Sequence, residues 1–356
     1  MASQNTRIKV GVVGFGMSAR VFHCPLIASN SNYELVAVVE RHAAQSKKLY
    51  PQVQVVSNID ELLAIPDISL VIITTPNDTH VSYVKQTLLA GKNCVVEKPF
   101  TVTEAEARDM ARISKETGNV LSVFQNRRWD GDYLTVKRLV TNNALGEVVE
   151  IESRFDRFRA FKKQNAWREV ADFPGSGILY DLGAHLFDQI VDLVGVPEFI
   201  TGTVRNERKI EGAPDDSFLV VLDYPSKNFK ALCRAGMLVR DKPPRFTVLG
   251  MRGTFTKYGL DVQEDQLKEG VTPADSEYGK DKKEQFGTID SEIYPELHVR
   301  GTVTTDDGNY AAYYNNVAAA IRGEAGLIVT PEQAADVIRI IELAKQSSAE
   351  RKSLPF

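Results

Sequence analysis

The chain has 356 residues, a length that predicts two domains at roughly 150 residues each. Its 43 basic and 47 acidic residues leave a net charge of −4, so no overall positive field attracts nucleic acid. Hydrophobic residues make up 43% of the chain, which excludes disorder, and no apolar run reaches the roughly 18 residues of a membrane span. Neither an export signal nor a cysteine framework is visible. We therefore expect a cytoplasmic protein that binds neither nucleic acid nor membranes.

Strand-like and helix-like segments alternate along the first third of the chain. Short β-branched runs occupy residues 8–13, 34–39, 70–74, 93–96 and 121–124. Between them, an amphipathic stretch ends at Gly91, and another begins with a Thr-Glu cap pattern at Thr103 and ends at Gly118. Both glycines suit the left-handed residue that ends a helix, and the Thr-Glu pattern marks the start of the second one. The alternation is typical of βαβ units and predicts a Rossmann domain over residues 1–126.

The remaining residues, 127–356, have the pattern of a second domain. Longer strand-like segments occupy residues 148–155, 199–205, 217–222, 230–238 and 245–249. A polar tract over 261–287 predicts surface loop and short helix. A Thr-Pro-Glu start predicts a closing helix over 330–348, which either stays with the second domain or folds back on the first. The predicted fold class is α/β, with an α+β domain following the Rossmann domain.

The first strand runs directly into a loop of the form G-x-G-x-x-A. Its residues are Gly14, Phe15, Gly16, Met17, Ser18 and Ala19. In a dinucleotide loop the first glycine permits the tight turn, the second lets the backbone approach the pyrophosphate, and the small third residue packs helix on strand. The anion then faces the N-terminus of the helix. A triplet of small residues can also mark only a tight turn, so the next strand has to decide.

Glu40 ends the second strand, 24 residues after Gly16. This is close to the roughly 20-residue spacing at which an acid meets the adenosine ribose, so the sequence predicts a dinucleotide cofactor. Glu40 favours NAD, because its charge repels the 2′-phosphate of NADP. Arg41 follows it and can pair with that phosphate. The pair leaves NAD and NADP open.

Candidates for acid–base chemistry occur at two places. Lys98, in Glu97-Lys98-Pro99, follows the fourth predicted strand at the carboxyl edge of the sheet, where open α/β folds bind ligands. Asp181 and His185 are four residues apart near a predicted helix start and share a face. A surface lysine and a merely stabilising helix pair are the alternative readings. Because Lys98, Asp181 and His185 all occur in a chain that also carries a nucleotide loop, we favour a catalytic role for them.

These motifs together resemble the Gfo/Idh/MocA family of glucose-fructose oxidoreductase and inositol dehydrogenase. The resemblance covers nearly the whole chain. It is carried by Gly14-Phe15-Gly16, by residues 75–80, by Glu97-Lys98-Pro99 and by Gly177-x3-Asp181-x3-His185. Segments 126–130, 155–159, 167–169 and 258–261 are most similar to NADP-dependent scyllo-inositol dehydrogenases of bacteria, which usually carry a smaller or neutral residue at the position of Glu40.

The resemblance implies an open-faced, mainly antiparallel sheet in the second domain and a catalytic trio of Lys98, Asp181 and His185. It also implies cofactor contacts from Thr75, Pro76, Asn77, His80, Glu97 and Lys98. Alcohol oxidation needs a base for the hydroxyl proton, and histidine has an ordinary pKa of about 6.5. A protonated Lys98 would stabilise the developing alkoxide, and Asp181 would orient the imidazole or hold a neighbouring hydroxyl.

A polyhydroxylated substrate needs several fixed donors and acceptors. Arg127 and Trp129, just after the fifth predicted strand, are the first candidates, and Trp167, Arg168 and Tyr180 are weaker ones. Equally, Arg127 and Trp129 could join the two domains structurally. Aromatic turns at Tyr294 and at residues 309–314 could also reach the pocket.

Three functions agree with these residues. The first is an NAD(P)-dependent oxidoreductase acting on a secondary alcohol or ketone of a small polyol or sugar, such as a cyclitol. The second is a dinucleotide-binding regulator of the galactose-repressor type, and the third is a reductase of another carbonyl, imine or bilin. No metal is expected, because His23, His42 and His298 show no acidic or cysteine partners in the sequence. The second sheet predicts a homodimer or homotetramer.

Overall fold

The computed structural model describes residues 7–41, 44–163, 167–294 and 296–356. Within them the chain forms two compact units, each built from several segments. The first contains Met1–Asn126, Gln263–Tyr278 and Asn309–Ala335, and the second contains Arg127–Val262, Gly279–Gly308 and Asp336–Phe356. This division differs from a single boundary after residue 126, because two later segments belong to the first unit and the second of them includes the start of the closing helix.

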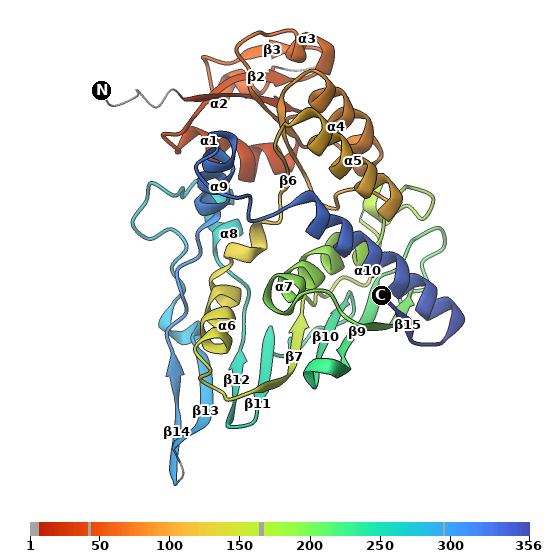
Figure 1. Cartoon of the computed structure of the whole chain (residues 1–356), viewed down its shortest axis with the longest axis vertical. Coiled ribbons are helices and arrows are strands. Elements are labelled where there is room, and N and C mark those ends of the chain that lie inside the picture. The colour runs from red at the N-terminus through yellow and green to blue at the C-terminus, as the bar shows by residue number, and fades with distance from the viewer. Residues whose placement is uncertain (1–6, 42–43, 164–166, 295) are drawn as a thin grey trace. The chain divides into compact units, whose positions relative to one another are not determined.

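A six-stranded parallel sheet forms the centre of the first unit, with the strand order β3-β2-β1-β4-β5-β6 (Figure 1). The strands are β1 (Ile8–Val13), β2 (Tyr33–Val39), β3 (Gln54–Val56), β4 (Leu70–Ile73), β5 (Asn93–Val96) and β6 (Leu121–Val123). Every residue of β4 is buried, as expected for a parallel strand covered on both faces. Five of these strands match the predicted ones. The three-residue β3 is too short to give a periodic signal.

Helices of the first unit come from both early and late parts of the sequence. They are η1 (Ala19–His23), α1 (Cys24–Ala28), α2 (Ser46–Leu49), α3 (Ile59–Leu63), η2 (Asn77–Thr79), α4 (His80–Leu89), α5 (Glu104–Thr117), α8 (Gln263–Lys268) and α9 (Tyr310–Ile321). The capping box that the sequence predicts for α5 is present, with Thr103 and Glu106 exchanging hydrogen bonds and Gly118 left-handed at φ 71°. Late in the sequence, α8 packs against η1, and α9 packs against α1.

A nine-stranded mixed sheet forms the second unit, in the order β14-β13-β12-β11-β7-β10-β9-β8-β15 (Figure 1). Its strands are β7 (Val148–Arg154), β8 (Phe199–Arg205), β9 (Ser217–Tyr224), β10 (Phe229–Gly236), β11 (Phe246–Gly250), β12 (Gly253–Lys257), β13 (Gly287–Tyr294), β14 (Leu297–Val303) and β15 (Leu354–Pro355). Neighbouring strands run antiparallel except β7 and β10. The predicted fold class, a Rossmann sheet followed by a mainly antiparallel sheet domain, is confirmed.

Helices accompany one face of this second sheet, where α6 contacts β11 and α7 contacts β10 (Figure 1). The helices assigned wholly or mainly to the second unit are η3 (Asn126–Trp129), α6 (Gly131–Thr141), η4 (Trp167–Glu169), η5 (Leu179–Gly183), α7 (Ala184–Val194), η6 (Pro225–Lys227), η7 (Lys283–Gln285) and α10 (Pro331–Glu350). The first turn of α10 belongs to the first unit. In the described parts of the chain no helix is long and apolar enough to cross a membrane.

Candidate active site

The predicted dinucleotide loop follows β1 and leads into η1, a π-helical turn. Gly14 has φ 95°, and a Cβ added there would lie 3.1 Å from Thr74 Oγ1, so a turn this tight requires glycine. Gly16 is exposed, and a Cβ added there would meet nothing within 4 Å. Ala19 is fully buried. A glycine that presents bare backbone to open space at the carboxyl edge of a parallel sheet fits the pyrophosphate of a dinucleotide.

The carboxylate of Glu97 lies where the end of β5 meets this loop. The Ser18 hydroxyl donates to Glu97 Oε1, and the backbone N–H of Lys98 donates to Oε2 at 3.0 Å. His23 Nε2 lies 2.9 Å from the same Oε1. Burial by itself raises the pKa of Glu97, but hydrogen bonds from His23 and Ser18, with positive charge on His23 in acid and on Lys98, hold it at about 2. Glu97 is therefore an ionised group at the cofactor loop.

His23 is the group that the sequence interpretation missed, since no acidic partner was expected for it. Its partner Glu97 is 74 residues away in sequence, so neither spacing nor periodicity could indicate the pair. His298 likewise contacts Asp290 from a neighbouring strand. Among the described residues, no three His, Cys, Asp or Glu side chains gather into a group that could hold a metal ion.

Glu40 has structural partners of its own. Its carboxylate accepts the backbone N–H groups of Gln45 at 2.9 Å and Ser46 at 2.8 Å, at the start of α2. The side chain is partly exposed, and Arg41 beside it is exposed. A carboxylate can accept about four hydrogen bonds, so the two backbone contacts leave Glu40 able to accept ribose hydroxyls as well.

The loop after β4 contains the residues expected at the cofactor, Thr75, Pro76, Asn77 and His80. Asn77 is buried and begins η2, and Thr75 is partly exposed. The ring of His80, which we expected to contact the cofactor, is fully buried. Its Nε2 lies 3.0 Å from the carbonyl oxygen of Thr75 and its Nδ1 2.9 Å from that of Pro99. His80 therefore links this loop to the turn that follows Lys98, which is itself half-buried.

In the second unit, Asp181 lies in the π-helical turn η5 and His185 in the first turn of α7. The preceding Gly177 has φ 90°, and a Cβ there would come within 2.2 Å of Asp215 Oδ1, so glycine is required. The other Asp215 oxygen accepts the N–H of Leu179 at 2.8 Å. The glycine of Gly177-x3-Asp181-x3-His185 is thus explained by Asp215, which binds the start of η5.

Two arginines flank the Asp181 carboxylate, whose side chain is 20% exposed. Arg168 Nε lies 3.4 Å and Arg157 Nη1 3.9 Å from it. Each guanidinium also stacks on an aromatic ring, Arg168 on Trp167 at 4.2 Å and Arg157 on Phe155 at 5.3 Å. Stacking fixes the plane of a guanidinium and leaves its N–H groups available to an oxygen-rich ligand. His185, one turn on, is buried with 5% exposure.

The other residues expected at the substrate differ in accessibility. Trp129, Trp167 and Arg168 are partly exposed, and Tyr180 is buried beside Lys345, whose Nζ lies 5.4 Å from its ring. Arg127 is buried, contacts Asp130 at 3.3 Å and stacks on Phe155 at 4.9 Å. These contacts hold the Arg127 side chain within the second unit.

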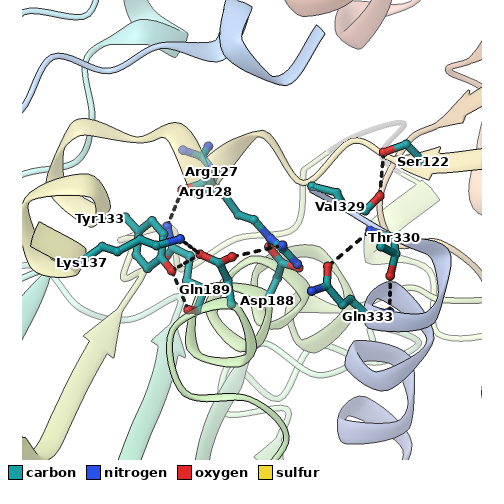
Figure 2. Close-up of polar contacts among 11 residues, drawn as sticks. Ser122, Arg127, Arg128, Tyr133, Lys137, Asp188, Gln189, Val329, Thr330 and Gln333 are labelled. Carbon is teal, nitrogen blue, oxygen red and sulfur yellow. Dashed lines mark hydrogen bonds and ion pairs between the residues drawn. The ribbon is translucent and has the colours of Figure 1, made fainter. Parts of the chain in front are cut away.

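Arg128, next in the chain, forms a buried polar cluster that the sequence interpretation did not identify. Its guanidinium donates two hydrogen bonds to Asp188, at 2.7 and 2.8 Å, and a third to Asp192 at 3.2 Å (Figure 2). Tyr133 donates to Asp192 at 2.5 Å and Lys137 donates at 2.7 Å. Asp188 and Asp192 lie on α7. Figure 2 shows Tyr133 and Lys137 of α6, and Arg128 of the segment before α6, pointing toward α7.

The aromatic segment around residue 310 is the helix α9 and not a turn. Tyr310, Tyr313 and Tyr314 are buried in the core of the first unit. Tyr313 donates to Ser122 Oγ, and the Tyr314 hydroxyl lies 2.5 Å from His23 Nδ1. The expectation that they line a pocket from the second domain is therefore wrong. The side chain of Tyr294 lies outside the described part of the chain.

A dinucleotide loop on a parallel sheet, followed by a mixed-sheet unit with an Asp-His helix start, defines an NAD(P)-binding oxidoreductase class. The profile "Oxidoreductase family, NAD-binding Rossmann fold" matches residues 8–125. The profile "Oxidoreductase family, C-terminal alpha/beta domain" matches residues 137–356. The chain belongs to the Gfo/Idh/MocA oxidoreductase family, as its motifs predict.

Several relatives match over almost their whole length. The chain is 41% identical to the uncharacterized oxidoreductase YdgJ of Escherichia coli, covering 98% of both chains. It is 36% identical to the scyllo-inositol 2-dehydrogenase (NADP(+)) IolW of Bacillus subtilis, covering 98% of this chain and 95% of IolW. The solved structure of yvaA from Bacillus subtilis superimposes with a TM-score of 0.94 at 36% identity, covering 99% of both chains.

Proposed function

We propose that this protein transfers a hydride between nicotinamide and a secondary alcohol or ketone of a cyclitol or sugar. The observation that carries the proposal is the start of the η5–α7 helix, where Asp181 stays partly exposed between two half-exposed arginines and precedes His185 by one turn. The name of IolW supports the substrate class, because IolW matches nearly the whole chain and is a scyllo-inositol 2-dehydrogenase.

Each residue of the proposed trio has one task. When bound, the dinucleotide supplies the nicotinamide that takes the hydride from the carbinol carbon. His185 accepts the hydroxyl proton, a task for which imidazole is the side chain that enzymes use most often. Lys98, if protonated, stabilises negative charge on the substrate oxygen, a contribution of about 3 kcal/mol for one well-placed donor. Asp181 orients the imidazole or holds a neighbouring hydroxyl.

Substrate hydroxyls would be held by the partly exposed side chains of Trp129, Trp167 and Arg168, with the buried Tyr180 as a further candidate. The stacked guanidinium of Arg168 suits this task, because its N–H groups keep a fixed direction. We assign Arg127 a supporting position, since Asp130 and Phe155 already hold it.

For the cofactor we propose NADP or NAD bound by residues 14–19 and by the loops after β4 and β5. Glu40 supports NAD, and Arg41 together with the NADP-dependent relative IolW supports NADP. Michaelis constants measured for both cofactors decide between them.

The decisive test is a panel of cyclitols, sugars and sugar phosphates, assayed with both oxidised cofactors by the absorbance of reduced nicotinamide. We expect turnover with at least one cyclitol or sugar, and a loss of at least about 100-fold in His185→Ala and in Lys98→Met. Cofactor binding without turnover of any member of this panel contradicts the proposal and favours a regulator of the repressor type or a reductase of another substrate.

We further propose that the protein acts in the cytoplasm as a homodimer or homotetramer. Exposed apolar side chains on the second sheet, such as Phe199 and Leu297, support association. Light scattering of the purified chain measures the subunit number, and a monomer at working concentration contradicts this part of the proposal.

A further inference from the structure

The Glu97 carboxylate in the first unit receives three different donors. Its oxygens accept the Ser18 hydroxyl, the Lys98 backbone N–H at 3.0 Å, and a ring N–H of His23 at 2.9 Å. Ser18 belongs to the dinucleotide loop and Lys98 is the proposed catalytic lysine. One carboxylate therefore ties the loop after β1 to the segment after β5, across the end of β4.

The π-helical form of η1 explains how two of these donors reach one oxygen atom. Ser18 and His23 are five residues apart, and Cys24 N–H bonds to the carbonyl of Ala19, five residues before it. Residues five apart lie closer to one face of a π-helix, whose hydrogen bonds join residues five apart, than of an α-helix, around which they are about 140° apart. The π turn thus places both side chains on the Glu97 side.

Tyr314 determines which nitrogen of His23 carries the proton. The Tyr314 hydroxyl lies 2.5 Å from His23 Nδ1, and within the described chain no other polar partner is found for it. Burial raises the pKa of Tyr314 far above its ordinary value, so the phenol keeps its proton. If His23 Nδ1 were protonated, the phenol proton would have no acceptor. Donation by Tyr314 to Nδ1 leaves the proton on Nε2, which then donates to Glu97.

The surroundings keep water away from the His23–Tyr314 end of this chain of hydrogen bonds. His23 is fully buried and lies 4.2 Å, between ring centroids, from Phe124, which also contacts Tyr314 at 5.9 Å. In such a setting an unmatched donor or acceptor is costly, so each polar group holds its neighbour in one arrangement.

We propose that His23 and Tyr314 are positioning residues of the dinucleotide site: Tyr314 fixes the Nε2–H tautomer of His23, and His23 holds Glu97 where it binds both Ser18 and the main chain of Lys98. Neither residue touches the cofactor. The proposal needs only the dinucleotide loop, so it stands or falls independently of the substrate class proposed above.

Tyr314→Phe is the sharpest variant, because it removes one hydroxyl and keeps the ring. Tyr313→Phe is its matched control, since Tyr313 is the adjacent buried tyrosine of α9 and hydrogen-bonds Ser122 at 2.9 Å, away from Glu97. We expect the two variants to lose similar stability, as each loses one buried hydrogen bond. Only Tyr314→Phe should weaken binding of reduced cofactor, followed by NADH and NADPH fluorescence, by about 3- to 10-fold.

Nuclear magnetic resonance supplies the second readout. The chain has five histidines, so a ¹H–¹⁵N spectrum of the ring nitrogens, with His23 assigned by its loss in His23→Gln, reports each tautomer. We expect Nε2–H at His23 in the native protein and in Tyr313→Phe, and a mixture in Tyr314→Phe. A native Nδ1–H or imidazolium form overturns the proposal. The proposal is also overturned if Tyr314→Phe binds reduced cofactor as tightly as the native protein does. It is likewise overturned if Tyr313→Phe loses as much affinity as Tyr314→Phe.

Glu97→Gln tests the role of the carboxylate that accepts all three hydrogen bonds. All three groups around Glu97 are donors, and an amide has only one accepting end, so glutamine must face at least one donor with its own N–H₂. We expect this variant to bind reduced cofactor more weakly than Tyr314→Phe. Tighter binding of reduced cofactor by Glu97→Gln than by Tyr314→Phe contradicts the proposal that Tyr314 acts on the dinucleotide site through His23 and Glu97.

Discussion

Asp188 and Asp181 lie two turns apart on the η5–α7 segment, and each faces arginine, but the two contacts differ in kind. Arg128 grips Asp188 with two hydrogen bonds at 2.7 and 2.8 Å, and both side chains are 2% exposed. Arg168 and Arg157 approach Asp181 only to 3.4 and 3.9 Å, and they are 42% and 43% exposed. The same residue types form a closed pair at one end of the segment and an open one at the other.

This difference in burial and distance distinguishes an ion pair that only stabilises the fold from one whose residues are candidates for ligand binding. In a buried, bidentate ion pair the arginine cannot turn away without leaving the carboxylate buried and unpaired, which costs several kcal/mol. A pair that water reaches stabilises by at most about 1 kcal/mol, so its arginines can turn toward a ligand at little cost. Accessibility and geometry, more than residue type, distinguish the partly exposed Asp181 from the buried Asp188.

The largest effect is expected at the closed pair. Arg128→Met leaves Asp188 and Asp192 buried without their main cation, so we expect the free energy of unfolding to fall by about 3–5 kcal/mol. Urea denaturation followed by circular dichroism measures it. The double variant Arg128→Met/Asp188→Leu removes both charges and should recover part of the loss. A loss below about 1 kcal/mol in the single variant would show that the pair is not closed.

Substitutions at Asp181 and His185, at the exposed end of the segment, should change activity more than stability. Asp181→Asn and His185→Ala are expected to lower turnover at least about 100-fold, because proton transfer from substrate loses its base or the group that orients it. The stability of Asp181→Asn should stay within about 1 kcal/mol of the native protein, since its ion pairs are exposed. Steady-state kinetics and urea denaturation on the same preparations separate the two effects. Full turnover in both variants contradicts the assignment.

Much of the fold could be read from the sequence because its signals are local. Buried β-branched runs mark β1, β2, β4, β5 and β6, and the capping box marks α5. The hairpin of β13 and β14 gave no such signal, because polar and apolar residues are mixed along both strands and neither contains a continuous buried β-branched run. The aromatic residues of α9 were misread because their burial depends on α1 and the core of the first unit, which are far away in sequence.

The candidate site shows the same limit. The spacing of Gly14, Gly16 and Ala19, and of Asp181 and His185, is a local pattern, and it predicted where those residues lie along the elements. Spacing could not indicate that Asp188 is closed by Arg128 or that Glu97 is paired with His23, since these partners are 60 and 74 residues apart. Sequence therefore supplied candidates, and contacts distinguished among them.

A smaller effect is expected at Glu40, an intermediate case with two backbone partners and a partly exposed side chain. Glu40→Ser removes a negative charge from the ribose end, so the ratio of kcat/KM for NADP over NAD should rise about tenfold. Arg41→Ala should shift the ratio the other way. The loss of two hydrogen bonds to α2 predicts weaker binding of both cofactors in Glu40→Ser. An unchanged ratio in both variants excludes these residues from cofactor choice.

The smallest effect concerns Asp215, which supports the open end of the segment by accepting the N–H of Leu179. Burial raises the pKa of Asp215 from 3.8 to about 6, and the Leu179 N–H and the charge of Lys345 only partly oppose this. The folded state therefore binds more protons than the unfolded state between about pH 4 and pH 6, so stability from this group falls as pH rises through that window. Because Asp215 is partly exposed, we expect a change on the order of 1 kcal/mol. Asp215→Asn, which keeps an acceptor for Leu179, should remove this slope from urea denaturation measured at several pH values. A slope that persists in the variant assigns it to other carboxyl groups and leaves Asp215 ionised across the whole range.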